Sequence, residues 1–206
     1  MSGYKQLIID TCLKHGLLRN QAAYVLATAE WETNRTFEPV KEAYWVKNAE
    51  QWRKKNLRYY PWHGRGFVQL TWERNYKHAG QKIGVDLIAN PDAAMQPDNA
   101  ANILVIGMVE GWFTGKKLAD YITLQKSQFT AARRIINGND KAKDIAAIAR
   151  RHDRELKADG YGETSATQPR KPNSHPIAPD THNNAPSGIL ALIIKLFKAI
   201  FGKVKP

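Results

Sequence analysis

The stretch Gly64–Thr71, GRGFVQLT, is the most informative segment of this sequence. Two glycines flank an arginine, which indicates a turn, and the residues that follow alternate in character, which predicts a short extended segment. In an extended segment Gln69 and Thr71 project to the same face, and their apolar neighbours project to the other. We therefore predict a small β element here, with an amide and a hydroxyl on its polar face.

Helical patterns lie on both sides of this element. Before it, apolar residues recur at helical spacing over residues 4–16 and 20–33, with Asn20 as the expected N-cap of the second helix. After it, similar patterns cover residues 72–84, 98–113, 128–136 and 141–158. Residues 34–62 lack periodicity and are rich in aromatic side chains, so we predict a long irregular segment there. The chain is therefore expected to be mainly α, with at most a small β element.

The composition changes near residue 162, which predicts a domain boundary. Residues 163–188 are rich in Pro, Ser, Thr, Asn and His, as flexible linkers are. In residues 189–206, Ile189, Ile193, Leu196 and Ile200 form an apolar stripe, with lysines on the other side. We predict a main domain over 1–162, a flexible linker over 163–188 and a cationic amphipathic helix over 189–206. The lysines and the linker favour contact with an anionic membrane or outer envelope over packing on the domain.

The charge is strongly basic, with 31 Lys and Arg against 19 Asp and Glu, a net charge of +12. Residues 1–162 hold 25 basic and 17 acidic residues, so most of the excess lies in the main domain. Such a balance favours a polyanionic partner: nucleic acid, anionic lipid or an anionic cell wall. The single cysteine, Cys12, excludes an intramolecular disulfide. We see no secretory signal, no membrane span and no metal-binding histidine pattern.

Several carboxylates precede the Gly64 turn. Hydrolysis of a glycosidic bond usually needs two of them, one as acid and one as base or nucleophile. The candidates are Glu30, Glu32, Glu38, Glu42 and Glu50. Glu30 and Glu32 point about 200° apart on a helix, so only one can face a given cleft, and the periodicity does not decide which. The nearby aromatic side chains suit the apolar faces of sugar rings.

Three blocks of sequence resemble glycoside hydrolase family 19, which contains chitinases and related phage endolysins. Trp31-Glu32-Thr33, followed by FEPVKE, resembles the family's His-Glu-Thr segment, with Trp in place of His. Residues 64–71, closing with Asn75-Tyr76, resemble its Gly-Arg-Gly-X-X-Gln-Leu-Ser/Thr signature. Residues 133–138, RRIING, resemble its Arg-Ile-Ile-Asn-Gly segment. The blocks occur in the family's order, and the resemblance implies a lysozyme-like α-helical fold.

The resemblance also implies roles for individual residues. Glu32 matches the general acid, and Glu42 is our choice of general base, with Glu38 and Glu50 left open. Thr71 matches the residue that helps to hold the nucleophilic water. Gln69, Asn75 and Asn137 match substrate-binding positions, and Tyr60 and Arg65 are further substrate-binding candidates. Arg150, Arg151 or Arg154 is expected near the catalytic acid. Asn137-Gly138 is also compatible with a simple helix stop, with Gly138 left-handed.

The resemblance and the charge together imply an inverting hydrolase that cuts β-1,4 bonds of bacterial peptidoglycan, without a metal or organic cofactor. We expect a monomeric phage or prophage endolysin, made in the host cytoplasm and released to the cell wall with help from a holin. One alternative is a chitinase. Another is a non-catalytic module that binds cell wall or nucleic acid. No nucleic-acid recognition motif is present, so nucleic acid is not an expected partner.

Overall fold

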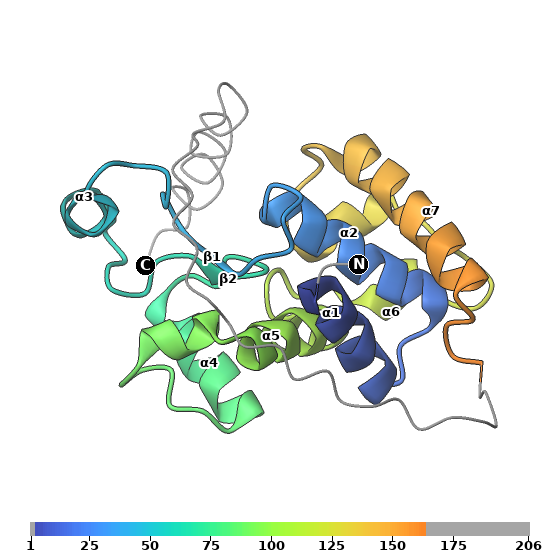
Figure 1. Cartoon of the computed structure of the whole chain (residues 1–206), viewed down its shortest axis with the longest axis horizontal. Helices are drawn as coiled ribbons and strands as arrows, with labels where there is room; N and C mark the ends of the chain where they lie inside the picture. The colour runs from blue at the N-terminus through green and yellow to red at the C-terminus, as the bar shows by residue number, and fades with distance from the viewer. Residues whose placement is uncertain (1–2, 164–206) are drawn as a thin grey trace. The chain divides into compact units, whose positions relative to one another are not determined.

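The computed structural model describes residues 3–163, which form a mainly helical domain (Figure 1). Its α-helices are α1 (Gly3–Lys14), α2 (Arg19–Glu32), α3 (Ala49–Asn56), α4 (Glu73–Ile83), α5 (Pro97–Glu110), α6 (Leu118–Tyr121) and α7 (Ala142–Ala158). Two short strands, β1 (Val40–Lys41) and β2 (Arg65–Gly66), and two 3-10 helices, η1 (Pro91–Met95) and η2 (Ala131–Ile135), complete it. The mainly α class with a small β element is confirmed. The predicted linker beyond Glu163 and the predicted helix at 189–206 lie outside the described residues.

Helix α2 is the centre of the core. Every residue from Ala22 to Glu30 is buried, as expected for a helix surrounded by protein on all sides. Helix α7 packs along α2, and α1 packs against α5 (Figure 1). The buried residues of α7, from Ile145 to Leu156, follow a single helical stripe, which explains why its sequence pattern is easy to read. No helix among residues 3–163 is long and apolar enough to cross a membrane.

The two strands form one short antiparallel ladder, in which Val40 pairs with Gly66 and Lys41 with Arg65. The chain then reverses at once, because Arg65 also pairs with Leu70 through two backbone hydrogen bonds of 3.2 and 2.9 Å. The predicted extended segment over 67–71 is therefore wrong: residues 67–69 form a turn, in which Gln69 is left-handed with φ 54°. Alternation of faces does not apply within so tight a turn.

Two helix boundaries also differ from the sequence prediction. Asn20 is not the N-cap of α2, which begins at Arg19 after Leu18. Its side-chain amide donates to the carbonyl of Thr123 and the hydroxyl of Ser127, both at 2.8 Å, so this side chain makes tertiary contacts from inside the helix. The helix predicted over 128–136 is a shorter 3-10 helix, η2.

Helix α3 lies within the segment predicted to be irregular. Its sequence, AEQWRKKN, has no apolar stripe, and its single buried residue is Arg53. The Arg53 guanidinium donates to the Glu50 carboxylate at 2.8 and 3.2 Å and to the carbonyl of Glu42 at 2.8 Å. Polar contacts of an arginine therefore hold this helix, which is why hydrophobic periodicity does not reveal it.

Candidate active site

Glu32 is the last residue of α2, and its side chain is only 8% exposed. The Arg133 guanidinium, 3% exposed, donates to Glu32 Oε1 at 3.0 Å. Arg133 comes from η2, and its Nε donates to the carbonyl of Asp140 at 3.2 Å. A charge with so little access to water needs a partner of opposite sign. Arg133 therefore balances and orients the carboxylate of Glu32.

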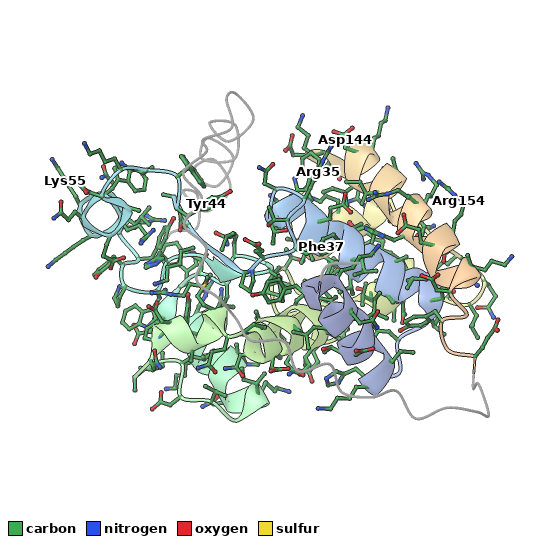
Figure 2. The ribbon with its side chains drawn as sticks, viewed as in Figure 1. Arg35, Phe37, Tyr44, Lys55, Asp144 and Arg154 are labelled. Atoms are coloured by element: carbon green, nitrogen blue, oxygen red, sulfur yellow. The ribbon has the colours of Figure 1, made fainter. Side chains whose placement is uncertain are left out.

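The arginines expected beside the acid do not contact it. Arg150 and Arg154 are exposed on α7, and Figure 2 shows Arg154 pointing away from the domain. Arg151 instead donates to Glu30 Oε2 at 2.5 Å. The expectation for these three residues is wrong, because the face of α7 that packs on α2 meets Glu30 and not Glu32.

Glu30 belongs to a separate buried cluster between α2 and α7. Its Oε2 lies 2.7 Å from Nε2 of His152, whose other ring nitrogen lies 3.0 Å from the Glu155 carboxylate. Lys5 donates to the same Glu155 oxygen at 2.8 Å. Burial and the Lys5 charge lower the pKa of His152. Glu30 is therefore tied to α7, whereas Glu32 is tied to η2 through Arg133, and the catalytic role of Glu32 stays a prediction.

Glu42 directly follows β1 and is fixed by two donors. Its Oε1 accepts a hydrogen bond from the Tyr59 hydroxyl at 2.7 Å, and its Oε2 accepts one from the Gly64 amide at 3.0 Å. The backbone amide of Glu42 donates in turn to the Gly64 carbonyl at 2.8 Å. Burial raises the pKa of Tyr59, so the phenol keeps its proton and remains a donor at neutral pH. The Gly64 turn thus holds the Glu42 carboxylate in one orientation.

The two competing carboxylates are held differently. Glu50 is exposed and accepts hydrogen bonds from Arg53 and, at 2.8 Å, from the Tyr60 hydroxyl. The Arg53 hydrogen bond lowers the pKa of Glu50, and the hydrogen bond to Glu50 raises the pKa of Tyr60. Glu38 is exposed in the loop before β1. Glu42 is the one of the three that is attached to the Gly64 turn.

Arg65 is a structural residue of this turn. It is 5% exposed, and its guanidinium donates to Asp92 at 2.7 Å and to the Tyr76 hydroxyl and the Pro61 carbonyl, both at 2.9 Å. The expectation that Arg65 binds substrate is corrected, because protein acceptors surround its guanidinium. Its role is to fix the turn that carries the Glu42 contacts.

Gln69, Thr71 and Asn75 form a connected group beside β1. The Gln69 amide donates to the Val40 carbonyl at 2.8 Å, and the buried Thr71 hydroxyl donates to the Gln69 carbonyl at 2.8 Å. The Asn75 amide donates to the Thr71 carbonyl at 2.7 Å. The structure therefore brings these three residues to the hairpin that also holds Glu42. Their roles toward water and substrate stay predictions.

Asn137 follows η2, and its backbone amide donates to the Arg133 carbonyl at 2.9 Å. Its side-chain oxygen accepts a hydrogen bond from the Gly138 amide at 2.8 Å. Gly138 is not among the residues with positive φ, so the alternative of a left-handed helix stop at this glycine is wrong.

The sequence did not indicate roles for Arg133 and Tyr59. Arg133 stands inside the third sequence block, but nothing local indicates that it reaches Glu32.

Residues 27–117 match the chitinase class I family, glycoside hydrolase family 19. The match contains Glu32, Glu42 and the whole Gly64 turn, whereas Arg133 and Asn137 lie beyond it. Over these residues the chain is similar to glycoside hydrolase family 19. Among curated proteins, it is 30% identical over 137 residues to Chitinase 11 of Oryza sativa subsp. japonica, a match that covers 54% of this chain and 52% of the relative.

Two further relatives match the chain over shorter stretches. Chitinase 8 of the same rice subspecies is 53% identical over 32 residues, 16% of this chain and 12% of the relative. Endochitinase 1 of Theobroma cacao is 62% identical over 29 residues, 14% of this chain and 9% of the relative. The chain spans at most about half the length of these plant proteins. The family therefore supports a glycoside hydrolase of the chitinase and lysozyme-like kind.

Proposed function

We propose that this domain hydrolyses β-1,4 glycosidic bonds of bacterial peptidoglycan with inversion of configuration. The observation that carries the proposal is the pair of fixed carboxylates inside the family 19 match. Glu32 is oriented by Arg133, and Glu42 is oriented by Tyr59 and the Gly64 amide. Acid and base catalysis at a glycosidic bond uses two carboxylates that flank the bond, about 6.5–9.5 Å apart in inverting enzymes.

In the proposed reaction Glu32 gives its proton to the glycosidic oxygen as the bond to the anomeric carbon breaks. A water molecule attacks that carbon from the opposite face of the ring, and Glu42 accepts the proton that the water loses. The products are a new reducing end and a free hydroxyl on the leaving sugar. Glu32 ends ionised and Glu42 protonated, and solvent restores both.

Charge favours peptidoglycan over chitin as the substrate. Chitin is a neutral polymer, whereas bacterial walls carry carboxylates on their peptides, so a basic protein is attracted only to the second. Residues 1–162 hold 25 basic and 17 acidic residues. The long-range attraction raises the rate of encounter with an anionic wall.

We extend the proposal to a lytic role in a phage or prophage, with release to the wall through a holin. Residues 189–206 would then act on an anionic membrane or outer envelope, by the apolar stripe and lysines of their sequence. A chitinase is the second candidate, because the three relatives are named as chitinases.

The test is digestion of purified Gram-negative sacculi and of colloidal chitin by the full chain, with Glu32→Gln as the matched inactive control. Mass analysis of borohydride-reduced products identifies which sugar carries the new reducing end, and proton NMR during the reaction gives its anomeric form. We expect muropeptides with inverted anomers. Release of chitin oligomers without muropeptides would assign the domain to chitin instead.

A further inference from the structure

The segment from Lys47 to Arg58 is the most basic part of the described surface that the catalytic assignment does not use. It holds five basic residues, Lys47, Arg53, Lys54, Lys55 and Arg58, and one acidic residue, Glu50. Lys47, Lys54 and Lys55 are exposed, and none has an ion pair within residues 3–163. The sole carboxylate of the segment is already bound by Arg53. Three lysine charges are therefore left for an external anion.

This basic surface is attached to the candidate base. Arg53 of α3 donates to the backbone carbonyl of Glu42, so the helix that presents Lys54 and Lys55 is tied to the residue after β1. Figure 2 shows Lys55 on α3 at the outer side of the described domain. The exposed ring of Tyr44, in edge contact with Trp45 at 5.1 Å, belongs to the loop between Glu42 and α3. The chain from Glu42 through Tyr44 thus leads to the helix that carries Lys54 and Lys55.

We propose that Lys47, Lys54 and Lys55 bind the carboxylates of the peptidoglycan stem peptides while the glycan lies at Glu32 and Glu42. This inference rests on the proposed function and names the part of the substrate that the surface recognises. In peptidoglycan every second sugar carries a peptide with several carboxylates, and chitin has none. A cationic surface on the segment that is joined to Glu42 through Arg53 therefore separates the two polymers by charge, although their sugar backbones are alike.

Most exposed lysines contact only water, so the experiment compares these three lysines with three exposed lysines elsewhere on the domain. The variant Lys47→Gln/Lys54→Gln/Lys55→Gln is compared with Lys14→Gln/Lys143→Gln/Lys157→Gln. The control lysines are exposed on α1 and α7 and also have no ion pair among the described residues. Both variants lose three charges, so general attraction to the wall falls equally. The substrates are intact sacculi and the same sacculi stripped of stem peptides by an amidase.

The triple variant Lys47→Gln/Lys54→Gln/Lys55→Gln is called the α3-surface variant. We expect it to lose about 3- to 100-fold in kcat/KM on intact sacculi, the range for three partly exposed ion pairs. On stripped glycan, which keeps the lactyl carboxylate of each muramic acid as its only charge, it should lose less than on intact sacculi. The control variant should lose less than the α3-surface variant on intact sacculi. Wild-type preference for intact over stripped wall should also fall as salt is raised.

Equal losses in the two triple variants, or an unchanged preference for intact wall in the α3-surface variant, would overturn the inference while leaving the proposed function in place. Loss of binding to phosphatidylglycerol vesicles with an unchanged wall preference would also overturn it, in favour of a lipid surface. Absence of any wild-type cleavage of either wall substrate is a different result, because it refutes the proposed function itself.

Discussion

His63, in the approach to the Gly64 turn, should make the stability of this domain depend on pH. Its side chain is 0% exposed, and neither ring nitrogen has a hydrogen-bond partner within residues 3–163. Burial, with the charges of Arg65 and Arg53, lowers the pKa of His63 from 6.5 to about 3. In the unfolded chain His63 therefore binds a proton as the pH falls through about 6.5, whereas in the folded chain it stays neutral there. The stabilisation is complete above pH 6.5 and is lost progressively as the pH falls toward 3.

The size of the effect follows from that difference in pKa. Between pH 8 and pH 5 the unfolded histidine gains its proton, whereas the folded one stays neutral. One pKa unit corresponds to about 1.4 kcal/mol, so the 1.5 units from 6.5 down to 5 lower the free energy of unfolding by about 2 kcal/mol. For a domain of this size the melting temperature should fall by about 4–8 °C from this residue alone.

The matched perturbation is His63→Phe. The imidazole stacks on the Tyr60 ring at 5.9 Å, and a phenyl ring keeps an aromatic contact there while removing both unpartnered nitrogens and the ionisation. Urea unfolding of both proteins at pH 8, 7, 6 and 5 gives the two pH slopes. His152 titrates equally in both proteins, so the difference isolates His63. If the difference in unfolding free energy is the same at pH 5 and pH 8, the reasoning about His63 is refuted.

The remaining predictions concern catalysis and the tail. Glu32→Gln should keep its circular dichroism spectrum and lose about 10²- to 10⁴-fold in kcat on sacculi, and wild-type turnover would remove Glu32 from the acid role. Tyr59→Phe should lower kcat about tenfold or more with KM little changed, because it removes one of the two donors that orient Glu42, and an unchanged kcat would contradict this. Truncation after residue 165 should leave activity on purified wall unchanged and reduce killing of intact Gram-negative cells; equal killing by both forms would exclude the membrane role.

Sequence periodicity determined the elements whose stability comes from an apolar face. Helices α4 and α7 were predicted within a few residues of their observed bounds, because their buried residues recur at helical spacing. The resemblance of three short blocks indicates Glu32 and Glu42 from the sequence alone. Helix α3 was missed because an arginine and not an apolar stripe anchors it.

Tertiary structure alone decided which polar groups meet. Arg133 lies 101 residues from Glu32 along the chain, and no local pattern encodes a contact at that separation. The same holds for Arg65. The sequence predicts that its side chain binds substrate, but in the fold it is buried and donates to Asp92. Burial of apolar residues depends on their type and on their spacing within one element, so it can be predicted from the sequence. An ion pair depends on two segments folding to the same place, which only the packed chain determines.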